Sequence, residues 1–287
     1  MLARFKSDQK RCPYCQSSMH QRLQSKWLII EARKCVYCGL IFRYPTDSND
    51  GARTFYERDY FGQQATGLPS QELIAQLKEA NFSNSQYNKA HRIQFLRSIC
   101  PNGRLLDFGC SWGYAVHQLK QAGYNAIGFE LARNRAEFGQ RFLGMDIRSD
   151  WEPLMIDCRS SFDVVYADHV LEHVSDLRTP LERFSELLKP SGLLVIFVPN
   201  AGGLIGRRLG LRWKAMLGEA HTIAFTDSWF LQNLPRHGFS VDSLSSYLDG
   251  PESLCDGEEL ICVARRNNSL KQISNLSGTQ CAALSVG

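Results

Sequence analysis

The sequence has 287 residues, enough for one large α/β domain of about 200 residues and a small accessory module. Its 44% apolar and 22% charged content is ordinary for a soluble globular protein, and its net charge of +4 does not by itself indicate nucleic acid or a membrane surface. No run approaches the ~18 apolar residues that a membrane span needs, which excludes spanning helices. Residues 1–6 contain no apolar core of signal-peptide length, so we expect a cytoplasmic location.

Four of the ten cysteines form two C-x2-C pairs with 19 residues between the pairs: Cys12, Cys15, Cys35 and Cys38. In a cytoplasmic chain this spacing is typical of a structural zinc site and not of disulfides. Four thiolates complete a tetrahedron around zinc and leave no position open for catalysis. We therefore predict a zinc ribbon over residues 8–45, with strands at Trp27–Ile30 and Leu40–Phe42. The alternative is four unrelated cysteines.

Residues 46–100 are expected to form a linker and a helical cap. The segment Pro45–Gly51 is polar and rich in turn-forming residues. Helical patterns follow at Gln71–Ala80 and at Ser85–Cys100, and the second has its apolar residues roughly on one face. We expect both helices to cover one side of the sheet that begins after them.

From residue 101 to residue 266, apolar strands alternate with helical segments. The expected strands are 105–107, 125–130, 145–147, 162–168, 193–198, 239–244 and 260–265. The expected helices are 114–119, 132–142, 179–189 and 227–236. The third of these helices has Thr179 as its N-cap and Pro180 at its first position. The alternation predicts the α/β class with a doubly wound, mostly parallel seven-stranded sheet, followed by a disordered tail at 267–287.

A glycine turn follows the first of these strands. The strand ends at Asp107, and Gly109 and Gly113 carry the chain into a helix that starts at Tyr114. Glycine allows close backbone approach, and the free N–H groups of the first helical turn suit a negatively charged or carboxylate-bearing ligand. The next strand ends at Glu130, whose carboxylate can accept hydrogen bonds from both hydroxyls of a ribose. This arrangement is typical of a nucleotide-binding sheet.

The same turn also fits G-x-S-x-G, the nucleophile elbow of hydrolases, with Ser111 as the nucleophile. An elbow serine normally follows several strands of its own sheet and an oxyanion loop. Upstream of Ser111 the sequence offers only a cysteine module and helical segments. A hydrolase would also leave Asp107 and Glu130 without a role, which disfavours this alternative.

Asp107, followed by the turn, resembles the first motif of class I S-adenosylmethionine-dependent methyltransferases, apolar-apolar-Asp-x-Gly-Cys-Gly-x-Gly. Ser111 stands where the middle glycine of that motif usually lies. The resemblance implies that Gly109, Ser111 and Gly113 hold the methionine end of the cofactor. It also implies that Asp107 lies near the cofactor's amino group and that Glu130 binds its ribose.

Two later segments extend the resemblance. Phe162–His173, with its V-L-E-H, resembles the motif after the fourth strand, and Leu188–Val195 resembles the motif before the fifth. The likeness covers about residues 100–200 and implies a Rossmann-like methyltransferase fold with S-adenosylmethionine as cofactor. It adds three predicted cofactor-binding residues: Asp150, Trp151 and Asp168. Of these, Asp150 or Trp151 is expected to meet the adenine.

The implied reaction is an in-line methyl transfer to an O, N or C nucleophile, for which alignment and desolvation supply much of the rate. Three histidines could accept a proton from the acceptor because imidazole titrates near neutral pH: His221, His173 and His169. We favour His221, which lies in an irregular segment where a loop can pass over the carboxyl ends of the strands.

Two other roles remain open for the histidines after the fourth strand. His169–His173 matches the H-x-x-E-H signature of zinc proteases. Some methyltransferases with a similar E-x-x-E-H use a divalent ion to orient the acceptor, but here His169 replaces the first glutamate. Alternatively, Glu172 and His173 only cap and pack a short helix.

The sequence supports a small-molecule methyltransferase acting on a sugar, lipid-linked or secondary-metabolite acceptor. The first alternative is an RNA methyltransferase whose zinc module recognises RNA, with Gly206–Lys214 contacting phosphates. The mild net charge and the lack of an N-P-P-Y-type motif disfavour it. The second alternative is an inactive methyltransferase-fold interaction protein, which Asp107 and Glu130 disfavour. The oligomeric state stays open.

Overall fold

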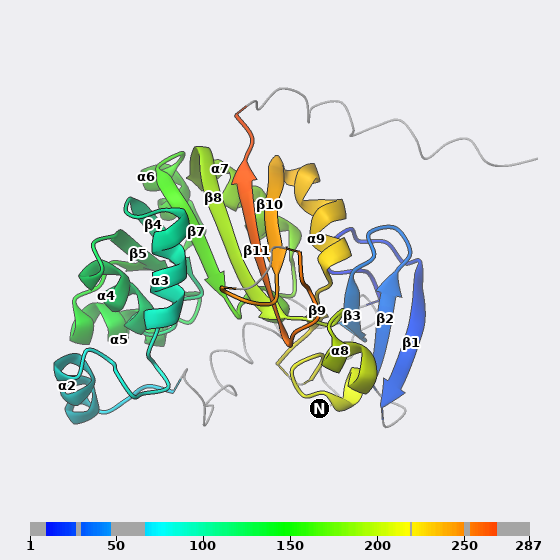
Figure 1. Cartoon of the computed structure of the whole chain (residues 1–287), viewed down its shortest axis with the longest axis horizontal. Helices are drawn as coiled ribbons and strands as arrows, with labels where there is room; N and C mark the ends of the chain where they lie inside the picture. The colour runs from blue at the N-terminus through cyan, green and yellow to red at the C-terminus, as the bar shows by residue number, and fades with distance from the viewer. Residues whose placement is uncertain (1–9, 27–29, 47–66, 219, 250–252, 269–287) are drawn as a thin grey trace, which may run out of the picture.

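The computed structural model describes residues 10–26, 30–46, 67–218, 220–249 and 253–268. Its largest feature is a seven-stranded sheet (Figure 1). In spatial order the strands are β10 (Phe239–Ser245), β11 (Glu259–Arg266), β8 (Leu188–Pro199), β7 (Phe162–Asp168), β4 (Arg104–Phe108), β5 (Asn125–Phe129) and β6 (Ile147–Arg148). The strands from β8 to β6 pair in parallel, and β11 runs antiparallel between β8 and β10. This confirms the predicted fold class.

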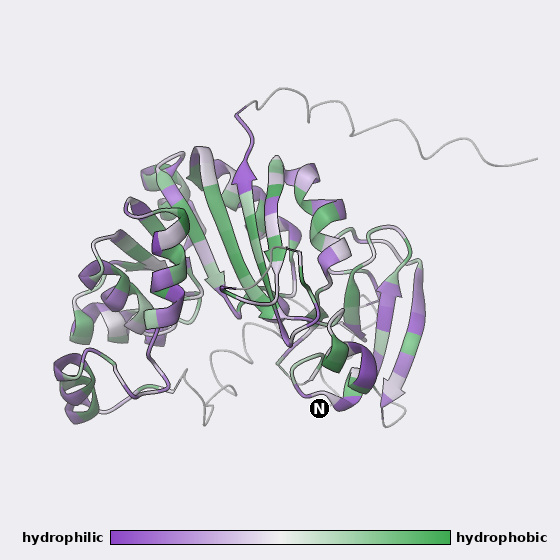
Figure 2. Cartoon of the chain, in the orientation of Figure 1, coloured by the Kyte–Doolittle hydropathy of each residue, from purple (hydrophilic) through white to green (hydrophobic). Residues whose placement is uncertain are grey.

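Helices cover both faces of this sheet because its strands are apolar on both faces. Leu105 and Val195 face one core cluster, and their neighbours Leu106 and Ile196 face the other. The first helical layer consists of α3 (Ala90–Ile99), α4 (Tyr114–Gln121) and α5 (Arg133–Leu143). The second layer consists of α6 (Trp151–Cys158), α7 (Arg178–Leu187) and α9 (Asp227–Asn233). Figure 2 shows the hydrophobic residues concentrated along the central strands.

A separate helix, α2 (Gln71–Glu79), packs with the turns that follow it around the fully buried ring of Trp112. The prediction at Gln71–Ala80 is therefore confirmed. The helix predicted at Ser85–Cys100 begins only at Ala90. The residues before it form turns, in which the backbone N–H of Lys89 donates to the Gln118 side chain at 2.9 Å.

The predicted N-cap of α7 is wrong. The side chain of Asp176 accepts hydrogen bonds from the backbone N–H groups of Arg178 (3.0 Å) and Thr179 (3.3 Å). A carboxylate satisfies the free donors of the first turn and interacts favourably with the helix dipole. The helix therefore begins at Arg178, and Thr179 lies inside it. The strand expected at 193–198 is also longer, because pairing with β7 starts at Leu188.

A second, four-stranded sheet has the order β1-β2-β3-β9. Its strands are β1 (His20–Lys26), β2 (Ile30–Cys35), β3 (Ile41–Tyr44) and β9 (Ile223–Ala224). The first three belong to residues 10–26 and 30–46, called the four-cysteine module below. The fourth comes from the irregular segment after β8, which also contains α8 (Leu204–Leu209) and the short 3-10 helix η4 (Gly210–Arg212). Two distant parts of the chain therefore build one sheet (Figure 1).

Some predictions fall outside the described residues. These are most of the strand at Trp27–Ile30, most of the linker, and the tail from residue 269. Of the predicted strand only Ile30 is described, as the start of β2. The strand predicted at Leu40–Phe42 corresponds to β3. Within the described ranges, no helix is long and apolar enough to cross a membrane.

Candidate cofactor and acceptor site

The glycine turn after β4 depends on left-handed backbone conformations. Gly109 has φ of 77°, Ser111 of 52° and Gly113 of 80°. Ser111 thus adopts a conformation that costs a residue with a Cβ about 1–2 kcal/mol, which explains why the family motif has glycine at this position. The N–H groups of Gly109 and Cys110 donate to the carbonyl of Phe129 at 2.7 and 3.2 Å. These bonds fix the turn against the end of β5.

Close packing also fixes the turn. A Cβ at Gly109 would lie 2.5 and 2.6 Å from the two methyl carbons of Val170, in the segment after β7. A Cβ at Gly113 would lie 2.7 Å from Cδ1 of Ile147 in β6. Both glycines are therefore required by space as well as by conformation. The turn therefore packs against β6 and against the segment after β7.

Glu130 follows β5 and faces this turn. Its Oε2 accepts a hydrogen bond from the N–H of Ser111 at 2.9 Å, and its Oε1 accepts one from the N–H of Ala132 at 2.8 Å. Burial raises the pKa of Glu130 above its usual range, although these hydrogen bonds oppose the rise. A carboxylate has about four lone-pair sites, so both oxygens can also accept hydrogen bonds from a ligand.

Asp107 is buried near the end of β4. Its Oδ2 has no hydrogen-bond partner among the described residues. Burial raises the pKa of this carboxyl to about 7. A buried polar oxygen without a donor is rare in a native protein. A ligand ammonium group would supply the donor and favour the ionised carboxylate, so the site fits the amino acid part of S-adenosylmethionine.

Asp168, at the end of β7, has cations beside it and hydrogen bonds at Oδ2, whereas its Oδ1 has no hydrogen-bond partner among the described residues. It accepts hydrogen bonds from Lys89 Nζ at 2.6 Å and from the Tyr166 hydroxyl at 2.7 Å, and an Arg92 nitrogen lies 3.5 Å away. Burial alone would raise the pKa of Asp168, but the two cations outweigh burial and lower it. Sequence reasoning missed Lys89 and Arg92. The only signal was two cations three residues apart within the helix predicted at Ser85–Cys100.

His169 follows Asp168 and lies between two carboxylates. Its Nδ1 is 3.1 Å from Glu172 and its Nε2 is 2.7 Å from Glu259, which also binds Arg92. Burial would lower the pKa of His169, but the two carboxylates raise it to about 10. His169 is therefore an imidazolium at neutral pH with both nitrogens engaged. Glu259, in β11, was not predicted as a site residue.

The other two candidate histidines lie together. The rings of His173 and His221 have centroids 4.6 Å apart at 85°. Nδ1 of His173 lies 3.2 Å from the carbonyl of Ala220, and Nδ1 of His221 lies 2.7 Å from the carbonyl of Ala215. Burial lowers the pKa of His173 to about 4. One donor atom each from Glu172, His173 and His221 lies within 4.8 Å of the others, an arrangement that could hold a cation.

The two predicted adenine-side residues differ in their surroundings. Asp150 follows β6, and its exposed side chain pairs with Arg133 at 3.2 Å. The ring of Trp151 packs instead on Phe129, with centroids 4.3 Å apart, and beneath the guanidinium of Arg183. Asp150 is therefore the more accessible of the two to a ligand at the end of β6.

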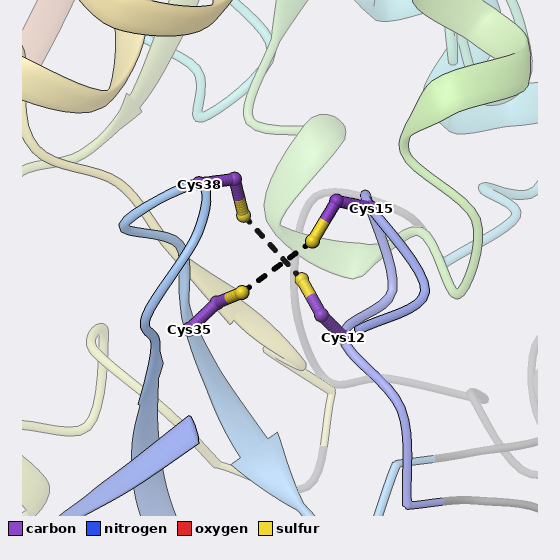
Figure 3. Close-up of side chains that lie close together, drawn as sticks. All are labelled: Cys12, Cys15, Cys35 and Cys38. Atoms are coloured by element: carbon purple, nitrogen blue, oxygen red, sulfur yellow. Dashed lines mark hydrogen bonds between the residues drawn. The ribbon is translucent and has the colours of Figure 1, made fainter. Parts of the chain in front are cut away.

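The four cysteine sulfurs meet at one point between the two knuckles (Figure 3). Sγ of Cys12 lies 3.5 Å from that of Cys38, and Sγ of Cys15 lies 3.4 Å from that of Cys35. All four lie within 4.8 Å of one another. Zinc–sulfur bonds of 2.3 Å give tetrahedral edges of about 3.8 Å, so the sulfurs fit a tetrahedral metal site after small shifts.

Comparisons with known proteins identify the family of this chain. Residues 82–244, more than half of the chain, match the family described as "Methyltransferase domain", and the chain belongs to that family. The "Ubiquinone biosynthesis O-methyltransferase" of Bradyrhizobium diazoefficiens is 34% identical over 131 residues, which are 41% of this chain and 51% of that protein. The protein of the same name from Rhodopseudomonas palustris is 31% identical over 126 residues, 40% of this chain and 49% of that protein. The chain thus spans about half the length of these curated relatives.

A solved structure shows the same fold. The S-adenosylmethionine-dependent methyltransferase from Clostridium acetobutylicum ATCC 824 aligns with a TM-score of 0.50 and 12% identity. The alignment covers 68% of this chain and 98% of that one. At this identity the alignment establishes the Rossmann-like methyltransferase fold alone.

Replacing Gly109 by alanine should destabilise the protein more than the same change at Gly144. Both glycines have positive φ (77° and 66°), but a Cβ at Gly144 meets nothing within 4 Å. Both variants lose about 1–2 kcal/mol to the backbone conformation. Gly109→Ala should lose about 1–3 kcal/mol more by overpacking against Val170, and adding Val170→Ala should recover part of it. Urea unfolding measures the difference; equal losses in the two variants would contradict the packing described.

The raised pKa of Asp107 makes stability depend on pH. The folded pKa of about 7 exceeds the unfolded value of ~3.9, so the stabilising contribution is complete below ~4 and is lost as the pH rises through about 7. The unfolding free energy of the wild type relative to Asp107→Asn should fall by up to ~1.4 kcal/mol per pH unit between pH 5 and 7 and level off above. Urea titrations across this range test it, and a rising difference would disprove the assignment.

Proposed function

We propose that this chain is an S-adenosylmethionine-dependent methyltransferase whose cofactor binds at the glycine turn and Glu130. The observation that carries the proposal is the Glu130 carboxylate held by the N–H groups of Ser111 and Ala132 at the carboxyl ends of β4 and β5. Ligands of open α/β sheets bind at this edge. Family membership and the shared fold support the same conclusion.

Each residue of the cradle has a distinct role in this proposal. The backbone of the turn from Gly109 to Gly113 approaches the methionine part, and Asp107 accepts hydrogen bonds from its ammonium group. Glu130 accepts hydrogen bonds from the ribose hydroxyls, and Asp150 or Trp151 borders the adenine. Asp168 lies at the edge toward the acceptor. When bound, the cofactor supplies an activated methyl group.

The acceptor is proposed to be a small molecule that offers an oxygen nucleophile. Two relatives are named as O-methyltransferases of ubiquinone biosynthesis, which favours an oxygen acceptor over nitrogen or carbon. A sugar, lipid-linked or secondary-metabolite hydroxyl meets this description.

His221 is proposed as the base that accepts the acceptor's proton. Its Nδ1 faces the Ala215 carbonyl at 2.7 Å and therefore carries the ring proton, which leaves a lone pair on Nε2. His169 is a cation engaged on both nitrogens, and burial depresses the pKa of His173. Neither is as well suited to take a proton at neutral pH. A divalent cation held by Glu172, His173 and His221 is the competing role for these groups.

A structural zinc ion is proposed for Cys12, Cys15, Cys35 and Cys38. The distances between their sulfurs suit tetrahedral coordination, and four protein ligands leave no open position. The metal would then stabilise the four-cysteine module without taking part in methyl transfer directly.

Replacing Glu130 by glutamine should weaken binding of S-adenosylmethionine at least tenfold. The change removes the charge that strengthens the two ribose hydrogen bonds, each worth roughly 1.5–3 kcal/mol. Isothermal titration calorimetry of the full chain measures the affinity. Glu137→Gln, an identical change at an exposed position of α5, is the control and should bind as the wild type does. Equal affinities in the two variants would remove the proposed cofactor site.

Replacing His221 by alanine should lower turnover by about 10²–10⁴-fold while cofactor affinity stays unchanged, because a general base contributes only to the chemical step. A panel of catechols, hydroquinones and nucleotide sugars is tested for the acceptor. The rate at which S-adenosylhomocysteine is released with each compound measures turnover. His91→Ala, an exposed histidine of α3, is the control. Full activity in His221→Ala would contradict the proposal that His221 is the base. A second contradicting result would be a wild-type enzyme that loses activity on chelation and regains it when Mg²⁺ or Mn²⁺ is added without zinc.

A further inference from the structure

We propose that the four-cysteine module is part of the acceptor side of the site: it fixes Gly218 and residues 220–225, which include His221, and so governs turnover of the acceptor but not cofactor binding. Arg43 and Thr222 are the positioning residues in this connection. The inference rests on the proposed function and extends it to a part of the chain that the family match at 82–244 does not include.

The module and this segment share one sheet. Ile41 and Phe42 of β3 pair with Ala224 and Ile223 of β9. The pairing is antiparallel, so the chain before β9 runs back along the end of β3. The two residues of β9 pair with β3, and Phe225 after them forms a bridge with Asn200. So short a strand has no stability of its own.

Arg43 continues this contact on both sides of His221. Its backbone N–H donates to the carbonyl of Thr222 at 2.9 Å, and its Nη1 donates to the carbonyl of Gly218 at 2.8 Å. The N–H of Gly218 in turn donates to the carbonyl of His221 at 3.1 Å. One buried arginine of the module thus binds the residues at the two ends of the turn that contains the proposed base.

Thr222 connects the same turn to the large sheet. Its backbone N–H donates to the carbonyl of Glu172 at 2.8 Å, and its hydroxyl donates to the carbonyl of Val174 at 3.1 Å. His221 therefore lies between an anchor on β3 and an anchor on the segment after β7. Loss of the first anchor would remove the hydrogen bonds from β3 that hold this turn, while the contacts of His221 with Ala215 and His173 remain.

The cysteine knuckles are themselves packed into the second core layer. Cys12, Cys35 and Cys38 are buried in one hydrophobic cluster with residues of β9 and α9. The Asn233 side chain donates to the carbonyl of Cys38 at 3.0 Å, and the N–H of Leu177 donates to the carbonyl of Pro13 at 3.2 Å. Metal binding that orders the knuckles would therefore also order β3 against β9, because folding and metal binding are coupled in such modules.

The cofactor cradle is held by other contacts. The glycine turn is fixed by Phe129, Glu130, Val170 and Ile147, all in the seven-stranded sheet or at its carboxyl edge. These contacts do not involve the four-cysteine module. Removing the metal should therefore loosen the acceptor side of the site and leave the structure of the cofactor side unchanged.

Hydrogen exchange measured by mass spectrometry on the full chain tests this separation. Zinc is removed with a chelator, and its release is quantified with a colorimetric zinc indicator. Peptides covering 218–225 should lose protection at least tenfold, whereas peptides covering 104–113 should keep theirs and S-adenosylhomocysteine should bind with unchanged affinity by calorimetry. Added zinc should restore protection. Unchanged protection at 218–225 in protein shown to be zinc-free would overturn the proposal, as would equal loss at 104–113.

Variants of Arg43 test the connection with zinc still bound. Arg43→Met, which cannot donate to Gly218, should retain zinc and ligand affinity but lower kcat/KM for the acceptor at least tenfold and expose 218–225 to exchange. Arg43→Lys, which can donate a hydrogen bond to Gly218, should recover part of the kcat/KM and part of the protection of 218–225 from exchange. Lys34→Met, at an exposed position of the same module, is the control. Wild-type exchange in Arg43→Met would overturn the role of Arg43. Failure of the wild type to bind S-adenosylhomocysteine would instead overturn the proposed function.

Discussion

A hydrogen bond from the N–H of Ser111 to the Glu130 carboxylate joins the glycine turn after β4 to the end of β5, and a second, from the N–H of Ala132, holds the other carboxylate oxygen. The geometry of the proposed cofactor site depends on these two bonds. Ser111 illustrates the constraint. The residue holds a left-handed conformation that usually requires glycine, and its N–H is one of the two donors to Glu130. The turn therefore keeps a left-handed residue at this position although a serine stands where the motif has glycine. Close packing of Gly109 on Val170 also fixes the turn against the segment after β7, which carries acceptor-side residues.

The distribution of charge divides the site into two halves. Asp168 has its own cations, Lys89 and Arg92, and a lowered pKa. Oδ2 of Asp107 is buried without a donor among the described residues, and the pKa of this carboxyl is raised. A ligand that brings a positive charge to Asp107 would relieve the cost of burying that carboxylate. S-adenosylmethionine, which carries an ammonium and a sulfonium, satisfies this requirement, whereas a neutral ligand would not.

Features encoded in short stretches of sequence were predictable. Each strand of the large sheet overlaps a predicted strand, and the cysteine spacing anticipated four sulfurs that meet. Contacts between distant segments were not predictable, because only the folded topology brings them together. Glu259 lies 90 positions after His169, and together with Glu172 it raises the pKa of His169, which makes a candidate base a cation. Likewise, no local pattern in the irregular segment after β8 indicated that it would complete the sheet of the four-cysteine module. The role of each residue toward cofactor and acceptor remains a prediction.

The most direct test of the central claim is a crystal structure of the full chain with S-adenosylhomocysteine. The account predicts the ligand across the carboxyl ends of β4 and β5, with both ribose hydroxyls within hydrogen-bond distance of Glu130 and the amino group beside Asp107. Ligand density elsewhere, or none at these residues in crystals grown at saturating ligand, would contradict it.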